Sequence, residues 1–560
     1  MNDRSEALAS LRDTIYAALD RRDFPAARQA IMRLLPQREA EALGLWASVG
    51  IESGDAAEAE EAVKKLRRVA PGDAYTRFLA ARVKFMRGET VAPARELAAL
   101  AREKNIPRAY QEKIYNLLGQ CCRFLGRSEE SVAAYLAASR AAAEPRLAAL
   151  EYSDYLFNAH YLPPPSPAER RRRAAGYGAF FKDVTPFLHR WREPEKKLRI
   201  GYISPDFRDH VVLRFCAALL TSYDRARFEV YAYMNAPEDE KSRALAREVD
   251  GWRNIFGASP AAAARQIYED GVDILVDLAG HTRGGALPVL AYKPAPVQVS
   301  GIGYFASTGL PAVDYFLGDV YLDDAAEQDA FTEKLLVLPH SHFCYLPFVA
   351  MPDAAPPPSL TRGFVTFGCF NNYSKVTDEM LLLWRRLLED VPGARLLLKS
   401  RLFGSAEGRE LATERFLRLG LDASRVELRG FSADYLAEYA DMDIALDTAP
   451  YTGGLTTCEA LYMGVPVVTL KGRTHGARFG ASLLRNAGLA ELVAESAAQY
   501  AEIAGLLAAS PETLAMLREK QRDILLASHL MNFRRYVREV EAAYEAVWRE
   551  WEERGAGAGR

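Results

Sequence analysis

Short runs of apolar and branched residues alternate with longer segments of helical periodicity from Leu198 onward. Runs such as LRIGYIS, FEVYAYM and VDILVDL predict strands, and segments between them, for example 260–269, predict helices. After a proline-rich interlobe linker at 346–362, the alternation restarts with VTFGCF, ARLLLKS, RVELRG, DIALDT and VPVVTL. This alternation is typical of parallel sheets. We therefore expect two Rossmann-like α/β lobes, 198–345 and 363–553, with a cleft between them.

Residues 1–160 carry a different pattern, rich in Ala and Leu and almost free of strand-like runs. Turn residues and prolines recur with a period of about 34 residues, which predicts stacked helix pairs. The clearest unit, which ends at Pro145, reads YNLLGQCCRFLGRSEESVAAYLAASRAAAEP and resembles a tetratricopeptide repeat (TPR). A non-repetitive helical bundle is the alternative. Either arrangement makes an all-α region suited to binding, and stacked pairs present a concave surface.

Two further segments are predicted to lie outside the domains. Residues 161–197 contain a proline cluster followed by four arginines, 170–173, and we expect a linker whose arginines form a solvated helix face. A phosphate site on the arginine run is the alternative. The glycine-rich end, 554–560, is predicted to be a disordered tail.

The charges of the chain nearly balance, with 71 Lys and Arg against 74 Asp and Glu. Binding of nucleic acid through its phosphates needs a basic excess, so we expect protein and small-molecule partners instead. No apolar run approaches the ~20 residues of a membrane span, and the first residues predict an amphipathic helix rather than a secretion signal. The six cysteines form no CxxC pair, which together with the lack of a signal predicts a reducing cytoplasm.

The stretch DTAPYTGGLTTCEALYMGVPVVTL has the features of a phosphate cradle. A buried strand precedes it, Gly453 and Gly454 allow a tight turn, and Thr456 and Thr457 begin a helix whose first N–H groups lack intrahelical partners. Such a helix start attracts anions. The alternative is purely structural, because Thr456 and Glu459 are spaced as a capping box.

Three other loops are predicted to meet the cradle, because ligands of α/β sheets bind beyond the carboxyl ends of strands. They supply His210 and His281 in the first lobe and Asn372 with Lys375 in the second. A lysine and helix amides suit a leaving nucleotide diphosphate, and a histidine suits the acceptor as base. The alternatives are a helix cap for His210, a solvated loop lysine, and a hydrogen-bonded turn residue for His281.

Other kinds of chemistry have little support in the sequence. Asp441 and Asp443 are spaced like a metal pair, but they lead into a strand and are better explained as a helix-to-strand connection. No His/Cys cluster has metal-ligand spacing. The chain lacks a GxSxG motif, which argues against a hydrolase with a nucleophile elbow. It also lacks a GxxxxGK[ST] motif, which argues against an ATPase.

Six ordered motifs resemble the O-GlcNAc transferase and SPINDLY family of protein glycosyltransferases: GYISPDF, DILVDLAGHT, KPAPVQVSGIGY, FNNYSK, GGLTTCEALYMGVPVVTL and HGARFGASLL. The resemblance covers about residues 198–545, with helical repeats in the position they occupy in the family. It implies a two-lobed GT-B fold and a metal-independent, inverting transfer from a nucleotide sugar. The acceptor that it implies is a hydroxyl or amide of a polypeptide.

The resemblance also implies roles for individual residues. Lys375 matches the lysine at the diphosphate, Thr456 and Thr457 the groups that hold it, Glu459 the ribose contact, and His210 the histidine regarded as base or sugar contact. We expect the donor to contact a set drawn from these loops: Asn372, Lys375, Gly453, Gly454, Leu455, Thr456, Thr457, Glu459 and His281.

The chain departs from the family pattern at the donor site. Leu455 replaces a polar residue, Glu459 stands where many members have Asp, and the turn after Tyr304 reads FASTGL. We expect GlcNAc transfer from UDP-GlcNAc to Ser or Thr of proteins docked by the helical region. The alternatives are UDP-glucose with an Asn acceptor, GDP-fucose with a Ser/Thr acceptor, and a non-catalytic scaffold that senses nucleotide sugar.

Overall fold

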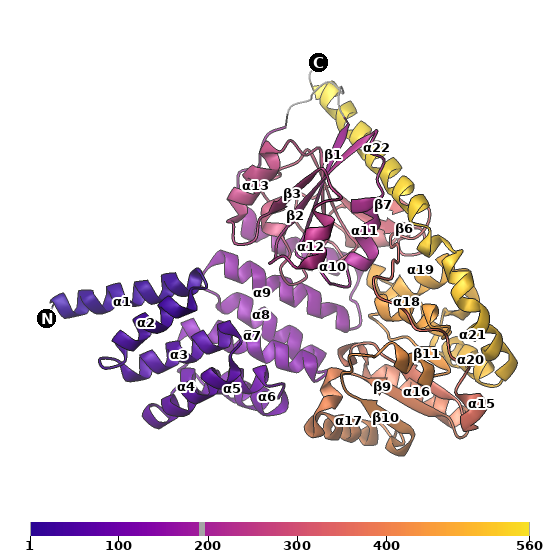
Figure 1. The fold of residues 1–560 in the computed structure, drawn as a ribbon, viewed down its shortest axis with the longest axis horizontal. Coiled ribbons are helices and arrows are strands. Elements are labelled where there is room, and N and C mark those ends of the chain that lie inside the picture. Colours follow the sequence, from indigo (N-terminus) through magenta and orange to yellow (C-terminus); the bar gives the residue numbers. More distant parts are fainter. Residues whose placement is uncertain (1, 190–196, 559–560) are drawn as a thin grey trace. The chain divides into compact units, whose positions relative to one another are not determined.

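The computed structural model describes residues 2–189 and 197–558 of the chain. These residues form two compact units, Met1–Tyr155 and Leu156–Arg560, which are described separately below (Figure 1). The boundary falls inside a helix near the expected end of the helical region at residue 160.

The first unit is entirely helical in its described part. Its helices are α1 (Asn2–Asp20), α2 (Phe24–Leu34), α3 (Glu39–Ser53), α4 (Ala56–Val69), α5 (Ala74–Met86), α6 (Val91–Leu100), α7 (Arg108–Phe124), α8 (Ser128–Ala141) and the start of α9 (Pro145–Asn158). Consecutive helices pack on one another, most extensively α3 on α4 and α7 on α8. The arrangement fits TPR helix pairs, as predicted.

Small and large residues interlock between α7 and α8, the pair with the clearest repeat pattern. A Cβ atom placed on Gly119 would come within 2.9 Å of the Tyr135 ring, so only glycine allows these helices to approach so closely. Between α3 and α4, Gly54 ends α3 with a left-handed φ of 81°, and the Asp55 side chain then accepts a hydrogen bond from the Glu58 N–H.

The segment predicted to be a linker, 161–197, contains helix α10 (Pro167–Gly178). Ser166 caps this helix and Pro167 occupies its first turn, a combination that favours a helix start. The arginine run lies on α10, where Arg170 forms a bidentate ion pair with Glu327 at 2.8 and 2.9 Å, while Arg171 and Arg172 are exposed. The segment therefore packs on the first lobe, and its residues 190–196 lie outside the described part.

The first lobe is built on a seven-stranded parallel sheet. Its order is β3-β2-β1-β4-β5-β6-β7, from β1 (Leu198–Ser204), β2 (Phe228–Met234), β3 (Gly251–Asn254), β4 (Ile274–Asp277), β5 (Val297–Ser300), β6 (Tyr315–Asp319) and β7 (Lys334–Leu338). The connecting helices are α11 (Leu213–Thr221), α12 (Glu240–Leu245), α13 (Pro260–Glu269) and α14 (Leu287–Leu290). Helix α13 has the predicted bounds, and Ser259 caps it.

The second lobe has a six-stranded parallel sheet of order β10-β9-β8-β11-β12-β13. Its strands are β8 (Thr366–Cys369), β9 (Arg395–Lys399), β10 (Val426–Arg429), β11 (Ile444–Leu446), β12 (Val467–Leu470) and β13 (Val493–Ala494). The helices are α15 (Ser359–Arg362), α16 (Asp378–Asp390), α17 (Ala406–Arg418), α18 (Leu455–Tyr462), α19 (Phe479–Asn486), α20 (Ala497–Ala508) and α21 (Pro511–Leu526). The two parallel-sheet lobes that the alternating pattern predicted are thus confirmed.

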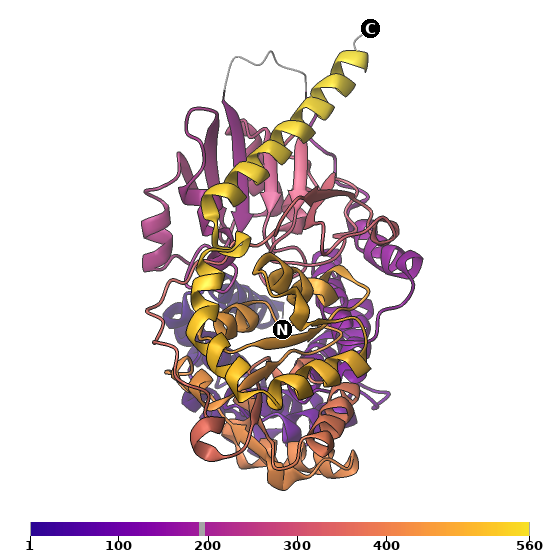
Figure 2. The same ribbon diagram turned by 90° about the vertical axis from the view of Figure 1, so that its right-hand side faces the viewer.

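The last helix, α22 (Phe533–Ala558), leaves the second lobe and runs along the first (Figures 1 and 2). Glu550 of α22 accepts a hydrogen bond from the Tyr315 hydroxyl at 2.9 Å, and Glu541 accepts one from the Asp224 N–H at 2.7 Å. The chain end therefore helps to join the lobes. Of the tail predicted to be disordered, the described residues belong to α22, and residues 559–560 lie outside the described part.

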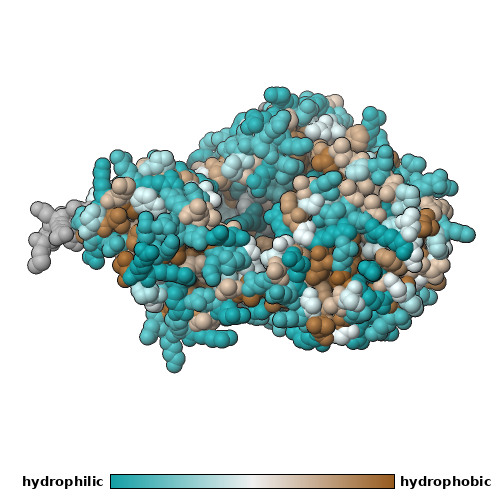
Figure 3. All heavy atoms as spheres, turned by 60° about the horizontal axis from the view of Figure 1, so that its bottom comes forward, coloured by the Kyte–Doolittle hydropathy of each residue, from teal (hydrophilic) through white to brown (hydrophobic). Residues whose placement is uncertain are grey.

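Among the described residues, none of the helices is both long enough and apolar enough to span a membrane. On the face drawn in Figure 3, hydrophilic residues divide the hydrophobic ones into small patches.

Candidate functional site

Neighbouring strands bring the predicted loops of the second lobe together. Strands β8 and β11 pair in parallel, so the residues that follow them, Asn371 and Asp447, emerge at the same edge of the sheet. The Asn371 amide donates to the Asp447 carboxylate at 3.0 Å and to the Thr448 hydroxyl at 3.0 Å. Its carbonyl oxygen accepts a hydrogen bond from the Thr456 hydroxyl. The loop after β8 is therefore tied directly to the start of α18.

Asp447 is the centre of this network and is 2% exposed. Its carboxylate also accepts from the N–H groups of Thr448 at 2.8 Å and Gly453 at 2.7 Å, and from the Thr469 hydroxyl at 2.7 Å. Burial raises the pKa of this carboxyl, whereas these hydrogen bonds and nearby Lys375 oppose the shift. The network fixes the backbone of the glycine turn that leads into α18.

Glycine is favoured at the two positions of the cradle, Gly453 and Gly454, for different physical reasons. A Cβ atom on Gly453 would lie 2.6 Å from the Thr457 hydroxyl oxygen and 2.8 Å from that of Thr456, so no larger residue fits. A Cβ on Gly454 would meet nothing within 4 Å, so the space beside this residue is open. Gly454 is the N-cap of α18 and supplies no side-chain cap, which leaves the first amides of α18 available to an anion.

The capping-box alternative for this stretch is wrong. Thr456 donates to Asn371, and Glu459 accepts a hydrogen bond from the Tyr435 hydroxyl at 2.6 Å, so neither side chain caps α18. Glu459 is 1% exposed, and an Arg214 nitrogen from the first lobe lies 3.3 Å from it. Burial raises the pKa of Glu459 to about 7. A ribose contact at Glu459 would have to share the carboxylate with these two partners.

Lys375 ends the short 3₁₀ turn that follows β8 and is not the solvated loop lysine of the alternative interpretation. Its Nζ donates to the Thr452 carbonyl at 2.8 Å and lies 3.6 Å from the centroid of the Tyr451 ring. Burial lowers the pKa of Lys375 to about 8, and Asp447 counteracts this shift. The Lys375 ammonium therefore lies beside the glycine turn of the cradle. Thr452 and Tyr451, from the loop that follows Asp447, hold it there.

The remaining predicted donor contacts of the second lobe differ in their exposure and packing. Asn372 is exposed, and its side chain accepts from the Ser374 N–H at 3.3 Å. Leu455 packs against the core, and Thr457 is 3% exposed beside Gly453. Of these, Asn372 is accessible on the loop that positions Lys375.

His210 lies in the loop between β1 and α11, with 40% of its side chain exposed. Its Nδ1 is 3.2 Å from the buried Asp206 carboxylate and 3.3 Å from the Val212 N–H. Burial raises the pKa of Asp206. The Asp206 carboxylate favours the tautomer that carries the proton on Nδ1 and leaves Nε2 free to accept one, whereas the hydrogen bond that the Val212 N–H donates to Nδ1 favours the opposite tautomer. The contact with Val212 also agrees with the capping interpretation.

His281 is 2% exposed and belongs to the packing of the first lobe. Its Nε2 bonds to the Thr308 carbonyl at 2.9 Å, and its ring meets those of Tyr177 and Tyr304 edge-on. Burial lowers the pKa of His281 to about 4, so the imidazole is neutral at physiological pH. These contacts support the hydrogen-bonded alternative over a direct donor contact.

Sequence reasoning missed Asn371, Asp447 and Tyr451. Asn371 and Asp447 directly follow strands at one sheet edge, so strand ends were the signal that could have identified them. Tyr451 carries no such signal, because its place beneath Lys375 depends on the fold of the glycine turn.

Asp441 and Asp443 serve structural roles, as expected. Asp443 accepts from the N–H groups of Ser359 at 3.0 Å and Thr366 at 2.7 Å, and Asp441 pairs with Arg429 at 2.7 Å. Within residues 2–189 and 197–558, no group of three or more His, Cys, Asp or Glu side chains could hold a metal ion.

Two parallel-sheet lobes with this glycine turn in the second define a protein of the GT-B fold. The sequence profile of glycosyl transferase family 41 matches residues 180–346 and 358–540, and the chain belongs to this family.

The chain is similar to plant and bacterial proteins of known name. It is 37% identical over 429 residues to the probable UDP-N-acetylglucosamine–peptide N-acetylglucosaminyltransferase SPINDLY of Petunia hybrida, across 74% of this chain and 44% of that protein. For the Arabidopsis thaliana protein named SEC, with the same enzymatic description, identity is 28% across 63% of this chain and 37% of that protein. The chain thus spans less than half the length of these relatives.

A solved structure covers almost the whole chain. The structure of a mutant O-GlcNAc transferase from Thermobaculum terrenum matches with a TM-score of 0.82 and 31% identity, across 92% of this chain and 98% of that one. The GT-B fold that the motifs implied is therefore confirmed.

Proposed function

We propose that the chain is an inverting protein glycosyltransferase that transfers GlcNAc from UDP-GlcNAc to Ser or Thr of polypeptides. The observation that carries the proposal is the Asp447 network, which ties Lys375 and the uncapped start of α18 into one anion-binding group in a family 41 fold. The printed names of the SPINDLY and SEC relatives support the sugar and the peptide acceptor.

The second lobe is proposed to bind the donor diphosphate. The amides at the start of α18 point outward with the positive end of the helix dipole, and the Lys375 ammonium adds a full charge. Negative charge grows on the diphosphate as the glycosidic bond breaks, so these groups stabilise the transition state more than the bound donor. With this charge supplied by the chain, we propose that no metal ion is needed.

The first lobe is proposed to activate the acceptor hydroxyl. With Asp206 beside Nδ1, the His210 imidazole offers Nε2 as general base for a single displacement at the anomeric carbon. The side-chain exposure of His210 leaves it accessible to a polypeptide.

The helical unit is proposed to dock the polypeptide, because stacked helix pairs expose an extended surface. We also propose a cytoplasmic location, since all six cysteines are free and buried, as in a reducing compartment.

The donor is tested first by calorimetric titration with UDP, GDP, UDP-GlcNAc, UDP-glucose and GDP-fucose, each with and without EDTA. We expect the uridine ligands to bind equally well in EDTA, with UDP-GlcNAc the donor that is also turned over. Preference for GDP-fucose or UDP-glucose would replace the proposed sugar, and loss of binding in EDTA would contradict metal independence.

The acceptor is tested with paired peptides that carry Ser, Thr or Asn at one position, with transfer followed by mass spectrometry. Modification of Ser and Thr alone is expected. Donor binding without transfer to any peptide or protein acceptor would favour the scaffold, whose helices bind a partner while the lobes sense nucleotide sugar.

A further inference from the structure

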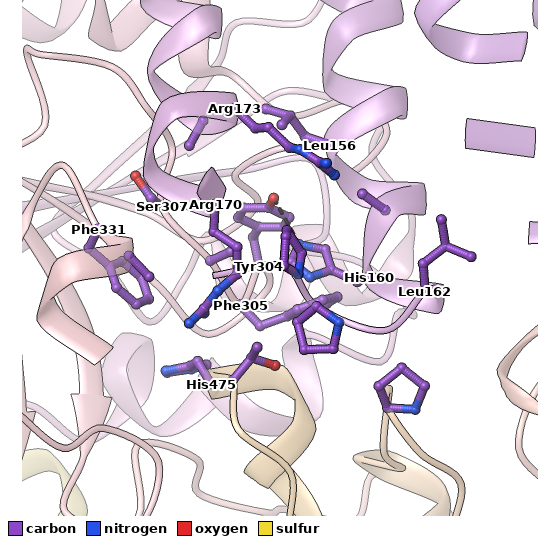
Figure 4. Close-up of a pocket in the computed structure, with 18 residues that line it drawn as sticks. Leu156, His160, Leu162, Arg170, Arg173, Tyr304, Phe305, Ser307, Phe331 and His475 are labelled. Carbon is purple, nitrogen blue, oxygen red and sulfur yellow. Dashed lines mark hydrogen bonds between the residues drawn. The ribbon is translucent and has the colours of Figure 1, made fainter. Parts of the chain in front are cut away.

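A cavity of about 70 Å³ lies within the second unit, and Asp447 is not among the residues that line it. It is lined by the segment 156–174, the loop after β5, the connection between β6 and β7 at Ala330 and Phe331, and two loops of the second lobe. Its walls are mostly apolar, with Leu156, Leu162, Phe305 and Phe331 among them (Figure 4). Since one water needs about 10–15 Å³ of such space, the cavity accommodates a group of side-chain size.

Two buried polar atoms on the cavity lining have no hydrogen-bond partner in the described part of the chain. One is Nε of Arg170, a donor, and the other is Nε2 of His475. Figure 4 shows the Arg170 side chain reaching from α10 toward His475. A buried polar atom without a partner is unfavourable, so the two atoms indicate a polar group that would pair with them.

The other atoms of both side chains are already held by acids. The terminal nitrogens of Arg170 pair with both Glu327 oxygens, and Nδ1 of His475 lies 2.9 Å from Asp323. His475 is 1% exposed, and its contact with Asp323 favours the tautomer in which Nε2 is an acceptor. These two side chains thus offer the cavity one unpaired donor and one unpaired acceptor, and each is already paired with an acid through its other nitrogens.

A hydroxyl satisfies both atoms at once, because it accepts from Arg170 and donates to His475. The apolar walls require that the rest of the ligand be a hydrocarbon surface, and Phe305, Phe331 and Tyr304 favour an aromatic ring. A water molecule would leave those walls uncovered, and a sugar would bury several unpaired hydroxyls against them.

The position of the cavity relates it to the proposed reaction. Pro450 lines the cavity, and the next residue, Tyr451, contacts Phe305 at 4.6 Å between ring centroids and lies beneath Lys375. The cavity is therefore separated from Lys375 by the Tyr451 ring, which contacts Phe305 on one side and Lys375 on the other.

We propose that this cavity binds a neutral aromatic hydroxyl and, resting on the proposed function, that the group is a tyrosine side chain of the acceptor polypeptide. Tyrosine near the modified Ser or Thr then contributes to acceptor selection.

Binding is tested without any donor, with p-cresol as the tyrosine side chain and toluene as the matched compound that lacks the hydroxyl. Calorimetry or ligand-observed NMR is expected to show p-cresol binding at least about tenfold more tightly, since toluene leaves Arg170 and His475 unpaired. Ala159→Phe fills the cavity from its partly exposed wall and should abolish binding. Ala168→Phe, at an exposed position of α10 outside the lining, is the control and should bind like the parent.

Acceptor selection is tested with Ser/Thr peptides that differ only in Tyr, Phe or Ala, scanned over neighbouring positions. At one position Tyr should lower KM about tenfold relative to Phe, and Ala159→Phe should remove this preference while donor affinity is unchanged. Equal binding of p-cresol and toluene, or p-cresol binding that survives Ala159→Phe in a folded protein, would overturn the site. Transfer that ignores Tyr would overturn its assignment to the acceptor.

The same measurements separate this proposal from the proposed function. If the parent transfers sugar but does not bind p-cresol, the cavity assignment fails and the transferase stands. If p-cresol binds as expected but no acceptor is modified, the transferase and the acceptor assignment fail, and the aromatic hydroxyl site stands.

Discussion

In the second lobe, Asp447 is 2% exposed and holds four neighbouring groups beside Lys375, whereas in the first lobe His210 keeps 40% of its side chain exposed. His281, also of the first lobe, is buried in aromatic packing away from that group. The proposed diphosphate site is thus held by buried hydrogen bonds in the structure without ligand, whereas the proposed base is partly exposed. Preorganised charge costs no rearrangement at the moment of reaction, which suits a leaving diphosphate. An accessible histidine instead suits acceptors of varied sequence.

Lys375→Ala gives the largest expected effect. Loss of a charge that acts mainly in the transition state should lower kcat about a hundredfold to a thousandfold and weaken donor binding much less. Lys375→Arg should recover only part of the rate, because a planar guanidinium cannot replace a compact ammonium. Steady-state kinetics at saturating donor decide the point, and a folded Lys375→Ala that works at the parent rate would remove this loop from catalysis.

His210→Ala should act on the acceptor step alone. A general base contributes about a hundredfold or more, so kcat should fall by about that factor, while calorimetric donor affinity stays at the parent value. Asp206→Asn should produce a smaller loss by disturbing the tautomer. If His210→Ala weakens donor binding as strongly as it slows transfer, this histidine is a sugar contact and not the base.

Asp447→Asn tests whether the cradle is preorganised. An amide cannot accept all the hydrogen bonds that the carboxylate accepts, so the free energy of unfolding should fall by about 2–3 kcal/mol and donor affinity by about tenfold. Asp422→Asn, in an exposed turn, is the matched control and should change both by little. Chemical denaturation and donor titration provide the readouts, and parent-like values for Asp447→Asn would contradict the network.

Donor affinity should fall by up to about tenfold between pH 7 and pH 9. Lysine is charged below its pKa, and burial sets that of Lys375 to about 8, so its ammonium is lost across this range. Glu459, with a pKa of about 7, gains negative charge in the same direction. Lys375→Ala should flatten the profile above pH 8, and Glu459→Gln should flatten it near pH 7. A profile unaffected by Lys375→Ala would assign the titration elsewhere.

His281→Phe should give the smallest change. The variant keeps a ring in the packing but loses the bond to Thr308, which costs about 1 kcal/mol of stability. Donor affinity and kcat should stay within about threefold of the parent. A larger loss of donor affinity without unfolding would restore His281 as a donor contact.

Local sequence predicted the elements of the two lobes better than it predicted the side-chain partners in the cradle. Alternating apolar runs and glycine turns act within a few residues, and they predicted both lobes, the start of α18 and the loop of Lys375. Whether Glu459 caps its own helix or pairs with Tyr435 depends instead on a residue from another element, and there the local pattern named a wrong alternative.

What the sequence by itself determined is the set of chemical groups at the strand ends, because strand and helix periodicity follow from local burial. Only the tertiary structure decided which of them meet. It joined Asn371 to Asp447 across β8 and β11, placed Tyr451 beneath Lys375, and buried His281 against Tyr304. The reason is physical: burial and hydrogen-bond partners are set by residues far apart in the chain, and a local pattern carries no information about that distance.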